Sequence, residues 1–175
     1  ISTGLVGSEM CIRDSYYREH GIEIRVARIF NTYGPKMSLD DGRVVSNFLA
    51  QALRGTPMTI YGDGKQTRSF QYISDLVAGL VALMDGDHTG PINIGNPGEF
   101  TMLELAEMIK EVVAPQLPPS VPAPTIVFKE NTSDDPQKRK PDITKAKTLL
   151  KWEPKVALRD GLGRMIEDFK NRLGL

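Results

Sequence analysis

The sequence contains one cysteine, Cys11, and two histidines, His20 and His88, among 175 residues. A single cysteine excludes an internal disulfide and is typical of a reducing compartment. Two histidines this far apart cannot build a zinc site without help from carboxylates, and they leave no Ser–His–Asp set to argue for. We therefore expect no metal centre and no serine-hydrolase chemistry.

Net charge and long apolar runs are also missing. The 22 basic and 22 acidic side chains cancel, so no global charge points to nucleic acid or to a membrane surface. No apolar run approaches the roughly 20 residues that a membrane-spanning helix needs. The first residues include neither an initiator methionine nor the pattern of a signal peptide, and we expect the chain to be a fragment of a longer protein.

The order of predicted elements indicates an α/β fold with short strands and loops rather than a long parallel run. Residues 22–30 predict a mostly buried strand, and Ser74 is the expected N-cap of a helix at residues 75–84. Thr101 and Glu104 have capping-box spacing. We expect strands at 22–30, 58–61, 68–73, 91–94 and 126–128, and helices at 44–53, 75–84, 101–113, 143–150 and 158–173.

Polar groups gather in three loops next to strand ends, where α/β folds place ligands. Asn31 and Thr32, with Arg43, could hold a sugar or phosphate, or could form a turn that satisfies its own backbone. Residues 61–68 (YGDGKQTR) combine two glycines with basic side chains for phosphate, or form a plain hairpin with solvated charges.

The third loop, residues 134–142 (DDPQKRKPD), has a basic triplet between prolines. This pattern fits a phosphate clamp, a nuclear-import-like patch or a solvated loop, and its flanking aspartates argue against a nucleic-acid patch. From the residues alone, the chain is an anion-binding α/β segment, suited to a phosphorylated small molecule.

The motifs in these loops resemble the extended short-chain dehydrogenase/reductase family, and within it the UDP-glucuronate decarboxylases. The YGDGxQxRxF pattern alone indicates the broader group of sugar-nucleotide epimerases and dehydratases. The motifs DDGRVVSNF and DPQKRKPD narrow this resemblance to the UDP-glucuronate decarboxylases. The matching stretches are VARIFNTYGP (26–35), DDGRVVSNF (40–48), TIYGDGKQTRSFQYISDL (59–76), INIGNPGEFTMLELA (92–106) and DDPQKRKPDITKAK (134–147).

This resemblance implies a reaction and an architecture. The family oxidises C4 of UDP-glucuronate with bound NAD, loses CO2 from the 4-keto intermediate and reduces C4 again to give UDP-xylose. Residues 16–175 would then be the C-terminal part of the enzyme, with the last Rossmann elements and a small substrate-binding α/β domain. NAD would be bound mainly by the N-terminal half.

The resemblance also implies roles for individual residues. Arg139 matches the arginine near the sugar carboxylate that is implicated in decarboxylation and protonation, and Thr32 matches a position beside the cofactor. Residues 59–68 match the segment around the uridine and diphosphate. The implied substrate-binding residues are Tyr16, Asn31, Arg43, Tyr61, Gln66 and Arg68.

The first residues depart from the family pattern. The catalytic Tyr-x-x-x-Lys pair would fall near positions 2 and 6, which are Ser2 and Val6. Residues 1–15 resemble no part of the family, and we interpret them as an artefactual segment. The glycine-rich NAD turn is expected upstream as well. A polypeptide of these 175 residues is therefore expected to lack decarboxylase activity.

Two alternatives remain open: another NAD-dependent sugar-nucleotide epimerase or dehydratase, and a non-catalytic paralogue that binds UDP-sugars. The resemblance implies a UDP-sugar as the small-molecule partner, no nucleic acid, and a homodimer in the full-length enzyme. It implies a cytoplasmic location, or the Golgi lumen if the full-length protein carries an N-terminal anchor.

Overall fold

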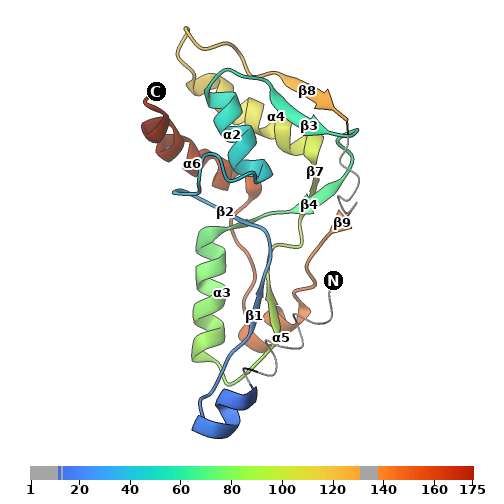
Figure 1. Ribbon diagram of the computed structural model, residues 1–175, viewed down its shortest axis with the longest axis vertical. Helices are drawn as coiled ribbons and strands as arrows, with labels where there is room; N and C mark the ends of the chain where they lie inside the picture. Colours follow the sequence, from blue (N-terminus) through green and yellow to red (C-terminus); the bar gives the residue numbers. More distant parts are fainter. Residues whose placement is uncertain (1–11, 13, 131–137) are drawn as a thin grey trace.

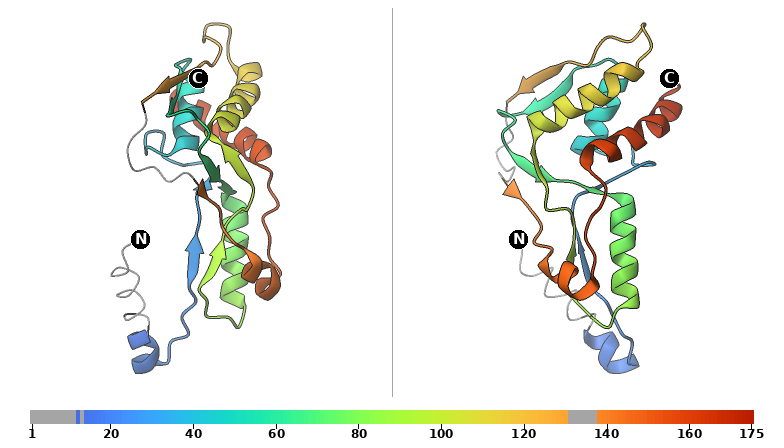
Figure 2. Two further views of the ribbon diagram at one scale, coloured as in Figure 1. Left: turned by 90° about the vertical axis from the view of Figure 1, so that its right-hand side faces the viewer. Right: turned by 180° about the vertical axis from the view of Figure 1, so that it is seen from behind.

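The computed structural model describes residues 12, 14–130 and 138–175, which form an elongated molecule with two ends (Figure 1). Three helices, α2, α4 and α6, gather at one end with strands β3 and β8. Helices α3 and α5 lie towards the other end with β1 and β6, beyond which the helical residues 14–20 extend. Two further views show the same division (Figure 2).

The elements are short, as the sequence predicts. The strands are β1 (Ala27–Ile29), β2 (Thr32–Tyr33), β3 (Met58–Tyr61), β4 (Thr67–Ser69), β5 (Gln71–Tyr72), β6 (Ile92–Ile94), β7 (Glu99–Thr101), β8 (Ile126–Lys129) and β9 (Lys138–Arg139). The helices are α2 (Val44–Leu53), α3 (Ile73–Asp85), α4 (Met102–Val113), the 3-10 turn η1 (Ala114–Gln116), α5 (Thr144–Leu150) and α6 (Leu158–Leu173).

The described strands form four small sheets instead of one continuous sheet. Three are parallel pairs: β1 with β6, β2 with β5, and β3 with β8. In the fourth sheet β4 lies between the antiparallel β7 and the parallel β9. Because parallel neighbours need long crossovers, each pair joins segments that are distant in the sequence.

The larger core lies where α2, α4 and α6 pack together. Gly161 in α6 allows this helix to approach the ring of Tyr33, since a Cβ there would collide with the Tyr33 hydroxyl. That hydroxyl donates to the carbonyl of Leu158 at 3.3 Å. Burial raises the pKa of Tyr33 far above its usual range, so the phenol keeps its proton and remains a donor.

A smaller core joins α3, α5 and β6, and Asp75 fixes the chain beside it. The buried Asp75 carboxylate accepts from the backbone N–H groups of Lys155 at 3.1 Å and Val156 at 2.9 Å. Its carbonyl accepts from the Trp152 indole at 3.1 Å. The connector between α5 and α6 is thereby attached to the first turn of α3.

The start of α3 corrects one expectation. Tyr72, not Ser74, is the N-cap residue, so Ser74 lies inside the first turn and makes no cap hydrogen bond. The helix begins earlier because β5 leads straight into it. At α4, by contrast, the predicted capping box is confirmed, because Thr101 accepts from the Glu104 N–H at 3.1 Å and Glu104 accepts from the Thr101 N–H at 2.7 Å.

Three strand predictions are also corrected. The strand predicted at 22–30 is only β1, and Ile22 and Ile29 are exposed, because within the described residues β1 pairs with β6 alone. The strand predicted at 68–73 divides at Phe70, where the chain passes from one sheet to another. The third correction concerns the loop predicted at residues 134–142, which contains the short strand β9.

The glycine turn at residues 62–64 does not form a plain hairpin. Gly62 and Gly64 have φ values of 75° and 74°, in the left-handed region that favours glycine. The strands on either side, β3 and β4, do not pair with each other, since β3 pairs with β8 and β4 with β7 and β9. The turn therefore connects two different sheets.

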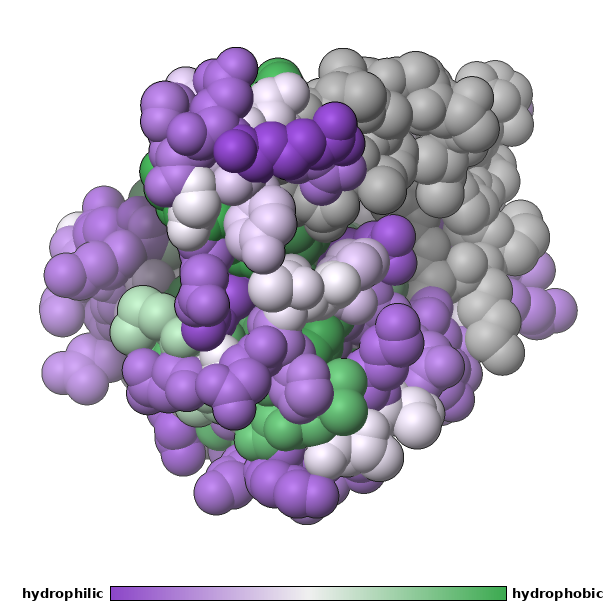
Figure 3. All heavy atoms as spheres, turned by 90° about the horizontal axis from the view of Figure 1, so that it is seen from below, coloured by the Kyte–Doolittle hydropathy of each residue, from purple (hydrophilic) through white to green (hydrophobic). Residues whose placement is uncertain are grey.

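Much of the surface is polar. In the view from below, hydrophilic side chains cover most of the coloured face, and apolar side chains show in smaller patches between them (Figure 3). No helix in the described part of the chain is long and apolar enough to cross a bilayer.

Candidate functional site

A cleft of about 470 Å³ opens between α2, β3 and β4. Its walls mix amide and basic side chains with apolar ones. Its lining residues are Asn31, Gly42, Val44, Asn47, Phe48, Gln51, Thr59, Ile60, Tyr61, Gln66, Arg68, Met102 and Lys129.

One face of α2 forms a wall of this cleft. Asn47, Phe48 and Gln51 lie three, four and seven residues after Val44, so the four share one side of the helix. The helix was predicted from the sequence, but Asn47 and Gln51 were missed as site residues. The signal was present, because apart from Ser46 these two amides are the polar residues of an apolar helix.

Two glutamine amides in the cleft are held by the backbone. The Gln51 Oε1 atom accepts from the Thr59 N–H at 3.1 Å, which ties α2 to β3. The Gln66 Nε2 atom donates to the Tyr61 carbonyl at 2.8 Å, which bridges the glycine turn. Both side chains are therefore fixed at the wall of the cleft.

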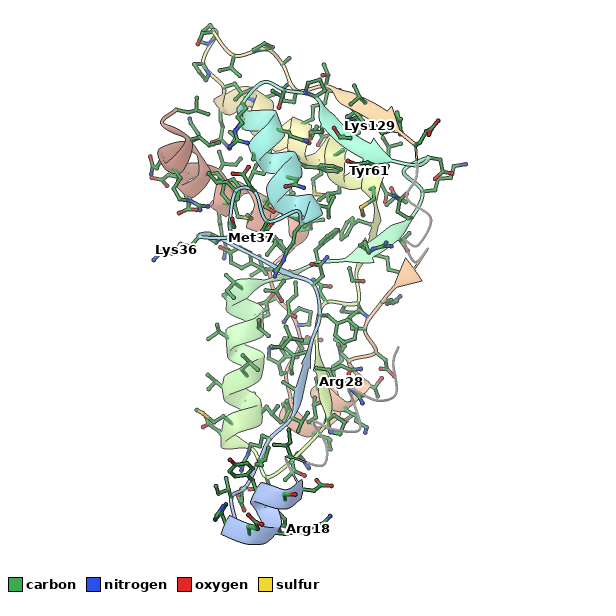
Figure 4. All side chains as sticks on the ribbon, in the orientation of Figure 1. Arg18, Arg28, Lys36, Met37, Tyr61 and Lys129 are labelled. Carbon is green, nitrogen blue, oxygen red and sulfur yellow. The ribbon has the colours of Figure 1, made fainter. Side chains whose placement is uncertain are left out.

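The positive charge of the cleft comes from Arg68 and Lys129. Arg68 donates through Nη1 to the Thr67 carbonyl at 2.9 Å, and Lys129 lies at the end of β8 opposite Tyr61 in the β3–β8 register. Figure 4 shows Tyr61 and Lys129 at the same end of the molecule. Lys129 was missed from the sequence, because only the pairing of β3 with β8 brings it here.

Four predicted substrate-binding residues meet in this cleft: Asn31, Tyr61, Gln66 and Arg68. Arg43 is the N-cap residue of α2, between two lining positions, and its Nε lies 3.5 Å from an Asp41 carboxylate oxygen. It flanks the cleft without lining it.

Thr32, the predicted cofactor residue, lies in β2 directly after Asn31. Its hydroxyl donates to the Phe30 carbonyl at 2.8 Å, and its backbone pairs in register with Gln71. Thr32 is thus held next to the cleft, with its hydroxyl oxygen still able to accept a hydrogen bond.

The structure does not bring Tyr16 to the cleft. Its side chain is 52% exposed and its ring lies 5.6 Å from that of His20, on the helical residues 14–20. Arg18 of the same segment lies at the end of the molecule opposite Tyr61 and Lys129 (Figure 4).

Arg139 lies in β9, where its Cα pairs in register with Arg68. The backbone of the predicted decarboxylation residue is therefore one strand away from a residue that lines the cleft. Residues 134–137 of the same loop, and the positions Ser2 and Val6, lie outside the described residues. Within the described part of the chain, no group of three or more potential metal ligands comes together.

The arrangement suits an extended anion with a polar ring at each end. The basic side chains of Arg68 and Lys129 provide positive charge for a phosphate, and the amides and Tyr61 provide hydrogen bonds and a ring face.

Comparison with known proteins agrees with this chemistry. The family model described as GDP-mannose 4,6 dehydratase matches residues 7–165. UDP-glucuronic acid decarboxylase 1 of Arabidopsis thaliana is 68% identical over 158 residues, which are 90% of this chain and 35% of the relative. UDP-glucuronic acid decarboxylase 5 of the same plant is 65% identical over 160 residues, covering 91% of this chain and 45% of the relative.

Solved structures show the same fold. UDP-glucose 4-epimerase from Thermotoga maritima, with UDP-glucose, gives a TM-score of 0.83 at 32% identity over 96% of this chain and 52% of its own. UDP-glucuronic acid 4-epimerase from Bacillus cereus, in complex with UDP-glucuronic acid and NAD, gives a TM-score of 0.78 at 32% identity. The match covers 96% of this chain and 51% of the epimerase chain. The chain thus spans less than half of these two plant relatives and about half of these solved chains.

Proposed function

Because this chain belongs to the GDP-mannose 4,6-dehydratase family, among the NAD-dependent sugar-nucleotide epimerases and dehydratases, we propose that it is the substrate-binding part of a UDP-glucuronate decarboxylase. The observation that carries the proposal is the 68% identity to a decarboxylase of this name. The cleft supports it, because four of the predicted substrate residues converge there.

In this proposal the diphosphate lies against Arg68, with Lys129 adding positive charge from the facing strand. Tyr61 and Gln66 contact the nucleoside, and Asn31 contacts the sugar where β1 has ended. Arg43, at the mouth of the cleft, contacts the substrate once it releases Asp41. Tyr16 stays a predicted substrate residue.

Arg139 is proposed to act on the sugar carboxylate. Loss of CO2 moves an electron pair into the adjacent carbonyl, so negative charge grows on oxygen in the transition state. A guanidinium stabilises such charge, and its high pKa makes it a poor proton donor. We therefore assign Arg139 to electrostatic stabilisation, next in the sheet to the diphosphate-binding Arg68.

NAD would supply the oxidation and reduction of C4 when bound. Of the described residues, Thr32 fits one edge of such a cofactor, because its hydroxyl oxygen can still accept a hydrogen bond. No glycine-rich turn between a strand and a helix occurs in the described residues. The rest of the cofactor site would lie in the part of the family fold that this chain does not match.

Several properties of the whole enzyme belong to the same proposal: a homodimer, a cytoplasmic location with the Golgi lumen as the alternative, and no turnover by these 175 residues alone. A rival within the family is an epimerase, favoured by the similarity to UDP-glucuronic acid 4-epimerase. The two differ in whether the product keeps the carboxylate.

The proposal is tested by UDP binding to the purified chain, measured by isothermal titration calorimetry. We expect Arg68→Gln to weaken UDP binding by about 10- to 100-fold, because hydrogen bonds to a charged group contribute about 1.5–3 kcal/mol. Arg54→Gln is the matched control, since Arg54 faces Asp40 outside the cleft. Equal binding by the unaltered chain and Arg68→Gln, or no binding of UDP at all, would contradict the placement of the diphosphate.

A further inference from the structure

We propose that Gln51 is a specificity-determining residue that reads the nucleobase of the substrate, with Gln66 as its partner. This inference rests on the proposed function, and it assigns one end of the cleft to a base with the hydrogen-bonding pattern of uracil. It is carried by the direction in which the two amides are held.

The orientation of the Gln51 amide follows from its partner. A backbone N–H can only donate, so the atom that faces Thr59 at 3.1 Å must be the oxygen. The Nε2 group then points away from that bond, and it donates to no group among the described residues. Since Gln51 lines the cleft, it presents a fixed donor there.

Gln66 is held in the opposite sense. A backbone carbonyl can only accept, so the atom that faces the Tyr61 carbonyl at 2.8 Å must be Nε2. The Gln66 oxygen is left as an acceptor, and this side chain also lines the cleft. The protein backbone thus sets one donor and one acceptor, with no freedom for either amide to reverse without losing its bond.

The positions of Gln51 and Gln66 restrict where a nucleobase can lie in the cleft. Gln51 lies two turns beyond Val44, about 10 Å along the wall formed by α2. Gln66 lies two residues before Arg68 in the chain, about 7 Å in an extended segment, which is a spacing that separates a base from a diphosphate. Gln51 bonds Thr59 and Gln66 bonds Tyr61, two residues further along β3, so both amides are held along the same strand.

A fixed donor and a fixed acceptor in one cleft match the imide edge of uracil. Its O4 carbonyl accepts from Gln51 Nε2, and its N3–H donates to Gln66 Oε1. Cytosine has an amino group and an unprotonated nitrogen at these two positions, so both contacts would be mismatched. A site built to hydrogen-bond one pattern rejects the reversed one, because its polar groups are left unpaired.

Gln51→Glu separates recognition from folding. The glutamate keeps an oxygen for the Thr59 N–H but replaces the donor that faces the cleft by an acceptor. We expect the unaltered chain to prefer UDP over CDP, and Gln51→Glu to lower the ratio of the two affinities by about tenfold or more. Because both ligands carry the same diphosphate, the ratio removes the repulsion added by the new charge.

Gln116→Glu is the matched control, since Gln116 lies at η1 outside the cleft and bonds the Val112 carbonyl. It should leave the ratio unchanged. The unaltered chain gives a second test that needs no variant: N3-methyl-UDP, which lacks the N3–H, should bind about tenfold more weakly than UDP.

The inference about the base and the proposed function on which it rests are contradicted by different results. If the unaltered chain binds UDP well but Gln51→Glu leaves the UDP to CDP ratio within twofold, or N3-methyl-UDP binds as well as UDP, the reading of the base by these amides is wrong. If the unaltered chain binds no UDP, the proposed function itself is overturned, and the inference falls with it.

Discussion

Replacement of Arg139 by leucine in the complete enzyme is expected to lower kcat for UDP-glucuronate decarboxylation by about 10²- to 10³-fold. This is the size of effect seen when one group that stabilises developing negative charge is removed. Binding of UDP should change far less, because in the proposal Arg68 holds the diphosphate and Arg139 meets the carboxylate end. The measurement is steady-state CO2 release beside calorimetric UDP binding.

The products that the Arg139 variant forms identify the reaction step that Arg139 assists. Oxidation of C4 does not require charge stabilisation at the carboxylate, so the variant should accumulate the oxidised sugar nucleotide, which mass spectrometry detects. Arg139→Lys should recover part of kcat, because it restores the charge but not the fork of donors. Arg159→Leu is the control, since Arg159 pairs with Glu111 on the surface. A loss of UDP binding that matches the loss of kcat would contradict this role.

Asp75→Ala is expected to lower the free energy of unfolding of the chain by about 3 kcal/mol. The substitution leaves the N–H groups of Lys155 and Val156 without their acceptor, and each unpaired, partly buried group costs about 1–3 kcal/mol. The connector between α5 and α6 would lose its attachment to α3. Urea unfolding followed by circular dichroism gives the difference.

Two further variants make this test specific. Asp75→Asn keeps an oxygen that can accept from the same N–H groups, so it should lose less than half as much stability. Asp87→Ala removes an exposed aspartate soon after α3 and should change stability by no more than about 0.5 kcal/mol. An Asp75→Ala protein as stable as Asp87→Ala would show that the connector is held by its apolar contacts alone.

Local patterns in the sequence predicted the elements that depend on local physics. The helices α2 and α6 begin and end at the residues predicted from their apolar periodicity, and the Thr101 capping box is formed. The α/β class follows from the order of elements, and the solved relatives confirm it. Four residues predicted by resemblance also meet in one cleft.

The remaining features depend on contacts between distant parts of the chain. Lys129 enters the cleft because β8 pairs with β3, and no periodicity reports such a pairing. Ser74 has the residue type of an N-cap, but α3 follows β5 directly and begins two residues too early for Ser74 to act as one. Asp75 accepts hydrogen bonds from the connector at residues 155–156. Its position in the first turn of a helix does not predict such a distant contact.

The fate of the sugar carboxylate is the most direct test of the central claim. The complete enzyme is incubated with NAD and UDP-glucuronate labelled with 13C at the carboxyl carbon, and the products are followed by NMR. A decarboxylase must release the label as CO2 and leave unlabelled UDP-xylose. A labelled UDP-uronate epimer that keeps its carboxylate would contradict the proposed function and assign this cleft to an epimerase.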